Sequence, residues 1–251
     1  MKVLLVGGSG HVGSFITPYL REKHDLRVLD VRRPAADVEF VEGSVTDPDA
    51  IRRAVDGVDA FVWLVMRKPQ GGTVRDQDIE TIVENYDMNA KGLHLFLYLA
   101  QEAGLRRGVY TSSMSVHYRK RESYPSEEAI PLDTPSVYGL SKGIGEGICQ
   151  YFCRWWDMNV IALRITGPRT RAQYLAERRN PPRDRADGSP PLFVTDEEDL
   201  ATAYLAALDA AMVGHNRFDA FFIAGDEHEK EHNLSKARRV LGWEPRSHRL
   251  L

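Results

Sequence analysis

Two side chains able to transfer a proton stand four residues apart, at Tyr138 and Lys142. On a helix this spacing places the phenol and the ammonium one turn apart on the same face. A free tyrosine, with a pKa of about 10, is a poor acid or base at neutral pH, and a neighbouring cation favours its phenolate. The pair is therefore suited to exchanging a proton with a substrate hydroxyl.

The spacing alone does not identify a catalytic pair, because Tyr19 and Lys23 repeat it. We interpret that copy as part of a solvated helix face. Tyr138 differs in its setting, since its predicted helix follows a strand that ends in Thr-Ser-Ser at residues 111–113. The carboxyl ends of parallel strands are where α/β sheets build their sites, which favours Tyr138 as the catalytic residue.

A glycine turn supplies a second chemical feature. Gly7, Gly10 and Gly13 lie between an apolar run at residues 3–6 and a helical pattern from about residue 12 to 23. Glycine lets backbone amides approach a pyrophosphate, and the following helix N-terminus favours that anion. A glycine triplet is also compatible with a plain turn between a strand and a helix.

An acidic residue, Asp30, ends the second predicted strand. A carboxylate at this place accepts hydrogen bonds from the adenosine ribose and repels a 2′-phosphate, which favours NAD over NADP. Arg32 and Arg33 follow directly and could instead bind a 2′-phosphate, so NADP stays as the alternative.

Apolar runs alternate with helical patterns, as is typical of a parallel sheet. Strands are predicted at 3–6, 26–30, 39–41, 59–65, 107–112, 160–164 and 218–223, and long helices at 79–103 and 135–157. Residues 167–195 are predicted to be a loop-rich excursion, ended by a capping box at Thr195 before a further helix. We predict an α/β fold, a Rossmann doubly wound parallel sheet. Residues 1–165 would form the dinucleotide-binding body, and 166–251 a small substrate-facing region interleaved with the same fold in a single structural unit.

Composition narrows the function classes. A net charge of -3 over 251 residues disfavours a protein that coats nucleic acid. No apolar run approaches the roughly 18 residues of a membrane span, so no membrane partner is expected. Cys149 and Cys153 lie four apart on a predicted helix, which disfavours a disulfide between them and indicates core residues rather than a metal pair. We therefore expect a reducing, cytoplasmic setting and no metal.

Taken together, these motifs resemble the extended short-chain dehydrogenase/reductase family, also called the NAD-dependent epimerase/dehydratase family. The residues that carry the resemblance occur in the family's order: 7–13 (GGSGHVG), Asp30, Asn89, Ser112, Ser113, Tyr138, Lys142 and 241–245 (LGWEP). Two places depart from the family's pattern. Ser44 stands where an aspartate usually touches adenine, and residues 165–168 are a variant of an asparagine-containing motif.

The resemblance implies roles for individual residues. Tyr138 would be the acid-base residue, and Lys142 would bind the nicotinamide ribose and lower the pKa of the tyrosine. Ser113 would orient the substrate hydroxyl, with Ser112 as the alternative if the strand register shifts by one. The implied cofactor-binding residues are Gly7, Gly10, His11, Val12, Gly13, Asp30, Ser44, Val45, Leu64, Val65, Asn89, Tyr138 and Lys142.

Seven arginines between residues 164 and 185 indicate an anionic substrate, because guanidinium groups suit carboxylate or phosphate. A solvated charged loop is the alternative interpretation. Among these arginines, Arg171 is the candidate for substrate binding.

The compact length and the 241–245 ending are similar to uronate dehydrogenases, which implies a small anionic sugar oxidised with NAD. A nucleotide-sugar epimerase or dehydratase that retains NAD is the rival, and a non-catalytic redox sensor is the alternative of another class. Sensors commonly lack the Tyr138 and Lys142 pair. The resemblance also implies a homodimer through the helices at 79–103 and 135–157.

Overall fold

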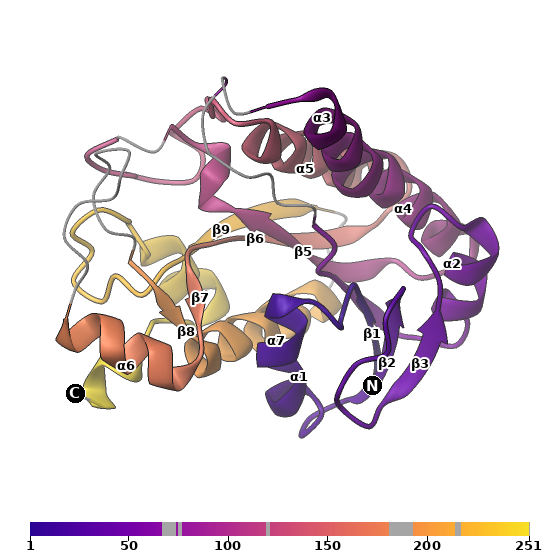
Figure 1. Ribbon diagram of the computed structural model, residues 1–251, viewed down its shortest axis with the longest axis horizontal. Coiled ribbons are helices and arrows are strands. Elements are labelled where there is room, and N and C mark those ends of the chain that lie inside the picture. Colours follow the sequence, from indigo (N-terminus) through magenta and orange to yellow (C-terminus); the bar gives the residue numbers. More distant parts are fainter. Residues whose placement is uncertain (67–73, 75–76, 119–120, 181–192, 214–216, 251) are drawn as a thin grey trace.

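A seven-stranded parallel sheet forms the centre of the protein (Figure 1). A computed structural model describes residues 1–66, 74, 77–118, 121–180, 193–213 and 217–250. The strand order is β3-β2-β1-β4-β5-β6-β9. The strands are β1 Lys2–Val6, β2 Asp25–Asp30, β3 Glu39–Glu42, β4 Ala60–Trp63, β5 Arg107–Ser113, β6 Asn159–Ile165 and β9 Phe218–Ile223. This topology confirms the predicted α/β, doubly wound parallel sheet.

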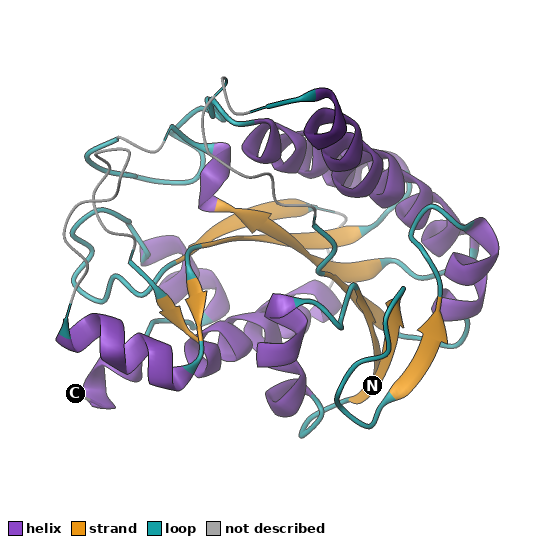
Figure 2. Ribbon diagram, in the orientation of Figure 1, coloured by secondary structure: helices purple, strands orange, loops and turns teal. Residues whose placement is uncertain are grey.

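Helices cover both faces of the sheet, and this explains the near-continuous apolar runs of the strands (Figure 2). The helices α1 His11–Leu20 and α7 Glu197–Val213 pack against each other on one face. On the other face lie α2 Pro48–Val55, α4 Leu93–Glu102 and α5 Val137–Trp155. β4 and β6 are buried along their whole lengths, because they lie between the two layers.

The long helix predicted at 79–103 is interrupted. It consists of α3 Ile79–Tyr86, a π-helical segment η1 Asp87–Gly92, and α4. Glycine is favoured at position 92, where the helix passes close to Val45, because a Cβ atom there would lie 2.8 Å from a Val45 methyl group. π-Helical turns are frequent at functional sites, and this one carries the buried Asn89.

The prediction for residues 167–195 is partly wrong. Regular structure follows Gly167, as β7 Pro168–Arg169, α6 Arg171–Arg179 and β8 Thr195–Asp196. Thr170 and Gln173 form a reciprocal capping box at the start of α6, a signal present in the sequence that the prediction missed.

The capping box predicted at Thr195 is also wrong, because Thr195 lies in β8 and its hydroxyl contacts that of Thr166 at 3.1 Å. The first turn of α7 is bonded instead by Asp196, whose Oδ1 accepts from the amide of Glu198 at 2.9 Å.

The C-terminal segment is held against α7. Asp199 accepts hydrogen bonds from the amides of Arg246 and Ser247, both at 2.9 Å. The indole of Trp243 donates to the carbonyl of Asp199 at 2.8 Å. Within the described ranges no helix is long and apolar enough to cross a membrane.

Candidate active site

The first turn of α5 lies against the segment that follows β5. Ser136 caps the helix by accepting the amide of Gly139 at 3.0 Å. Glycine is required at position 139, because a Cβ atom there would stand 2.0 Å from the carbonyl oxygen of Ser115. This close approach brings Tyr138, in the first turn, to the end of β5.

Tyr138 and Ser113 meet at this point through a hydrogen bond between their side chains. Tyr138 is half-buried, and burial of its hydroxyl raises its pKa to about 12, while the bond with Ser113 acts in the opposite direction. In the protein without cofactor, burial thus outweighs the influences that favour a phenolate.

Lys142 follows one turn later and is fully buried. Its Nζ donates to the carbonyl oxygens of Thr111 at 2.8 Å and Val65 at 3.2 Å. Burial lowers its pKa to about 7, and the neighbouring Cys149 and Glu146 act in the opposite direction. The amine therefore exchanges between its two protonation states near neutral pH, which is suited to a group that supports proton transfer.

Asn89 acts on the same helical turn from η1. Its Nδ2 donates to the hydroxyl of Ser141 at 2.9 Å and to Oδ1 of Asn85 at 3.2 Å. The Ser141 hydroxyl in turn donates to the carbonyl of Tyr138 at 2.8 Å. The π-helical turn thereby supports the backbone that carries the tyrosine.

The glycine turn joins β1 to α1 in the form that a dinucleotide requires. Gly7 has a φ of +81°, in the left-handed region, and a Cβ atom at Gly13 would lie 2.1 Å from the carbonyl oxygen of Gly8. Among the described residues, a Cβ atom at Gly10 would meet only the Gly7 oxygen, at 3.3 Å, which leaves space above the turn for a close approach. Residues and shape fit the pyrophosphate of NAD at the N-terminus of α1.

Asp30 ends β2 beside this turn. Its two carboxylate oxygens accept from the amides of Ser9 at 3.0 Å and Arg32 at 3.1 Å. The guanidinium of Arg33 stacks over the ring of Phe40 at 4.9 Å. The carboxylate is thus fixed where a ribose would lie, and this geometry fits NAD.

Other predicted cofactor residues lie around the same edge of the sheet. Val12 and Leu64 are buried in the core, whereas His11 is exposed and packs edge-on against Phe15 at 4.4 Å. Ser44 is half-buried, with its hydroxyl 2.8 Å from that of Thr46. Val45 is buried, and half-buried Val65 follows β4.

A model of the NAD dependent epimerase/dehydratase family matches residues 3–178. The chain belongs to this family. This confirms the predicted resemblance and the predicted enzyme class, an NAD(P)-dependent oxidoreductase of the extended short-chain dehydrogenase type.

Two curated relatives and one solved structure illustrate the family's range. The chain is 25% identical to an NAD-dependent glucose-6-phosphate dehydrogenase of Haloferax volcanii, over 97% of this chain and 92% of the relative. It is 28% identical to a uronate dehydrogenase of Pseudomonas syringae pv. tomato, over 65% of this chain but only 58% of that relative. A short-chain dehydrogenase/reductase from Agrobacterium tumefaciens with bound NAD shares the fold, with a TM-score of 0.81, 21% identity, and coverage of 100% of this chain and 95% of that one.

Within this family member, two predicted substrate residues lie apart from Tyr138. The Ser112 hydroxyl points into the interior, donates to Oε1 of Glu146 at 2.6 Å, and Ser112 is 1% exposed. Arg171 lies at the start of α6, where it forms ion pairs with Asp196 at 2.7 Å and Glu198 at 2.5 Å. The sheet register thus places Ser113, rather than Ser112, beside the tyrosine.

The arginine-rich segment is mainly structural where it is described. Arg164 is buried in β6, Arg169 pairs with Glu177, and Arg178 pairs with Glu227. Arg183 and Arg185 lie outside the described residues.

Sequence analysis missed a buried polar cluster beneath the site, formed by Glu146, Arg164, His117 and Ser112. The available signal was the position of Glu146, one turn beyond Lys142 on the same helix face.

Elsewhere in the interior, Cys149 and Cys153 are buried and free, as predicted. The part of the chain that the structure describes contains no group of acidic, histidine and cysteine residues able to hold a metal.

Proposed function

We propose that this family member is an NAD-dependent dehydrogenase that oxidises a hydroxyl of a small anionic sugar such as a uronic acid. One observation carries the proposal. Ser113, Tyr138 and Lys142 come together at the carboxyl end of β5, and the glycine turn and Asp30 lie at the same edge of the parallel sheet. A proton acceptor and a dinucleotide site at one sheet edge are what alcohol oxidation requires.

In the proposed mechanism, Ser113 and Tyr138 bind the substrate hydroxyl, and Tyr138 accepts its proton as the hydride leaves. Bound NAD supplies the hydride acceptor, and its positive charge favours the phenolate. The protonated amine of Lys142 stabilises the Tyr138 phenolate before that phenolate accepts the proton, and it would bind the nicotinamide ribose. Asp30 binds the adenosine ribose, and Ser44, Val45, Leu64 and Val65 line the remaining channel.

The anionic sugar is supported by relatives rather than by a visible pocket. The relative that is covered nearly end to end is a dehydrogenase of a sugar phosphate, and another is a uronate dehydrogenase. Arg171 stays the candidate for the substrate anion, and that anion would have to share its guanidinium with Asp196 and Glu198.

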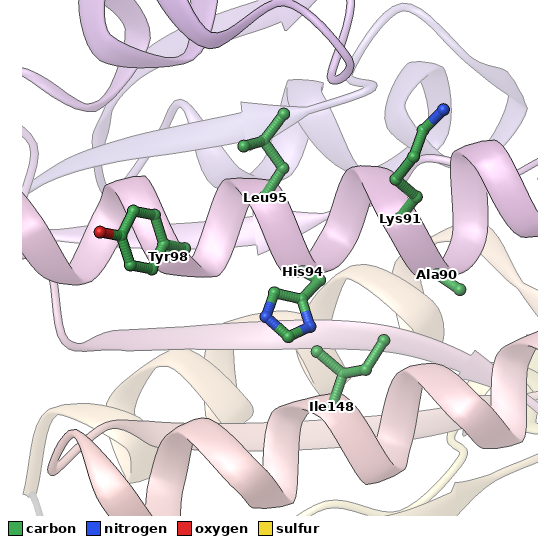
Figure 3. A pocket seen from close by; sticks show the side chains of 6 residues that line it. All are labelled: Ala90, Lys91, His94, Leu95, Tyr98 and Ile148. Atoms are coloured by element: carbon green, nitrogen blue, oxygen red, sulfur yellow. The ribbon is translucent and has the colours of Figure 1, made fainter.

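We also propose a homodimer through α3, α4 and α5, in a reducing, cytoplasmic setting. Large apolar side chains are exposed along these helices: Ile79, Ile82, Val83, Tyr98, Leu140, Ile144, Tyr151 and Trp155. A shallow pocket of about 460 Å³ lies between α4 and α5, lined by His94, Leu95, Tyr98 and Ile148 among others (Figure 3). A second copy would cover this apolar surface.

The test is to add NAD to the purified chain with uronic acids, sugar phosphates and nucleotide sugars, and to follow NADH absorbance and product identity. NADH formed with one anionic sugar supports the proposal. Interconversion of a nucleotide sugar without net NADH would replace it with an epimerase. Bound NAD without any turnover across the panel would indicate a redox sensor.

A further inference from the structure

Glu146 and Arg164 form an ion pair in the interior, beneath the site. The guanidinium holds both carboxylate oxygens, with Nε 2.9 Å from Oε1 and the second contact to Oε2 at 2.7 Å. The side chains are 1% and 6% exposed. Ser112 donates a further hydrogen bond to Oε1 at 2.6 Å. Removing a charge from water has a large free-energy cost, and the ion pair with its additional hydrogen bond offsets that cost here.

Arg164 is held in place by its position in the sheet and by contacts with His117 and Glu127. Its register partner across the β5–β6 pairing is Ser112, which places both donors side by side under the helix. Its remaining nitrogen lies 3.2 Å from Nε2 of His117 and donates to the carbonyl of Glu127 at 3.2 Å. Nδ1 of His117 lies 2.8 Å from the carbonyl of Pro131 and so carries the proton, which leaves Nε2 to accept from the guanidinium. Burial lowers the pKa of His117 to about 4, so this ring is neutral and does not compete for Glu146.

Glu146 lies one turn after Lys142 on α5, and its carboxylate bonds to the hydroxyl of Ser112, the residue after the Thr111 whose carbonyl accepts from the Lys142 amine. Among the described residues, the Thr111 carbonyl on β5 and the Val65 carbonyl after β4 bond to the Lys142 amine, and the Tyr110 ring lies 5.1 Å from it. The Cys149 thiol and the Glu146 carboxylate on α5 act on its pKa. Burial raises the pKa of Cys149 and of Tyr110 well above their usual values, so both are neutral at physiological pH. Among these groups, Glu146 alone brings a negative charge.

We infer that Glu146 is a positioning residue whose carboxylate, anchored by Arg164 and Ser112, keeps the buried Lys142 amine protonated for its work beside Tyr138. The inference rests on the proposed function, in which Tyr138 and Lys142 are the acid-base pair. It adds a residue that touches neither substrate nor cofactor and acts through the lysine.

The test measures the protonation of Lys142 directly, without cofactor or substrate. Lysine labelled with carbon-13 at Cε is followed by NMR over pH, and the Lys142 signal is assigned by its loss in Lys142→Met. In Glu146→Gln the carboxylate is replaced by an amide of the same shape, and the Lys142 midpoint falls by at least about 1 pH unit. In Glu146→Asp, where the charge is withdrawn by one carbon, the midpoint falls less.

The matched control is Glu227→Gln, which removes a carboxylate that is 8% exposed and paired with Arg178, on the loop after β9. It leaves the Lys142 midpoint unchanged. A folded Glu146→Gln protein with the parent's midpoint would overturn the inference. Where Glu146→Gln does not fold, an unchanged midpoint in Glu146→Asp overturns it instead. Because no substrate is used, failure of the sugar panel would not affect this result.

Discussion

The proposed chemistry depends on the hydroxyl oxygen of Tyr138. Tyr138→Phe retains the ring and removes the hydroxyl that bonds to Ser113. We expect turnover to fall at least about 100-fold while NAD affinity stays within about twofold of the parent. Steady-state rates and NADH fluorescence titration give the two values.

Tyr19→Phe is the control, because Tyr19 has the same spacing to a lysine but lies on α1. This variant should keep full turnover. Equal losses in the two variants would remove Tyr138 from the mechanism.

The buried amine of Lys142 works against folding, which gives a prediction with a definite sign. Its pKa of about 7 in the folded state lies below that of an unfolded lysine. The unfolded chain therefore binds more protons between about pH 7 and pH 10, and this residue's contribution to stability falls as pH falls through that window.

Lys142→Met lacks this pH-dependent contribution to stability. Relative to the parent, its free energy of unfolding should rise by roughly 3 to 5 kcal/mol as pH is lowered from about 10 to about 6. Turnover should fall at least about 100-fold, since the cation beside Tyr138 is lost. Urea unfolding across this pH range checks the slope, and parallel stability curves for the two proteins would contradict it.

At the residue scale, sequence reasoning predicted the proposed acid-base pair but not the buried residues beneath it. Tyr138 and Ser113 could be predicted from the sequence, because local residue patterns mark the ends of strands and the starts of helices. Glu146 was not, since a charged residue on a helix is ordinarily solvated, and its partner Arg164 lies on a different strand. Such a contact depends on the tertiary register, which no local pattern specifies.

The first turns of α1 and α5 each contain a glycine under severe steric constraint, and we expect the two positions to affect cofactor binding and catalysis separately. At Gly13 a Cβ atom would lie 2.1 Å from a backbone oxygen, and at Gly139 the distance is 2.0 Å. Alanine at either place should cost about 1 to 3 kcal/mol of stability, because backbone must move. The functional losses should differ, since Gly13 shapes the dinucleotide turn and Gly139 seats Tyr138.

We expect Gly13→Ala to weaken NADH binding at least about tenfold, and Gly139→Ala to lower turnover with NADH affinity nearly kept. Fluorescence titration and rate measurements on the two folded proteins test this. The reverse pattern, or the same loss in both, would contradict the division of roles.

The elements themselves were largely predictable, because parallel strands buried on both faces are apolar along their length. The exceptions have physical causes. The π-helical turn at 87–92 passes close to Val45 at Gly92, a tertiary contact that no local pattern specifies. Helix α6 is strongly charged, so it lacks the apolar periodicity of a core helix even though Thr170 and Gln173 mark its start.

At the scale of the whole molecule, exposed apolar side chains of the described residues gather on α3, α4 and α5, and we expect a second copy to cover them. Light scattering after size exclusion should give twice the chain mass of 28.4 kDa. Tyr98→Glu, on this surface and 43% exposed, should give monomers because a charge would be buried at the interface.

Val213→Glu, at the end of α7 and 79% exposed, is the control and should remain dimeric. A monomeric parent chain would refute the proposed dimer.

The packing of α1 against α7 has a consequence for biosynthesis. Residues 11–20 leave the ribosome early, while their partner helix begins only at Glu197. Because synthesis proceeds at about 5 to 20 residues per second, the apolar side of α1 lacks the segment that covers it for a time on the order of 10 s or more. The nascent chain should therefore be a client of chaperones that shield apolar surface until α7 has been synthesised.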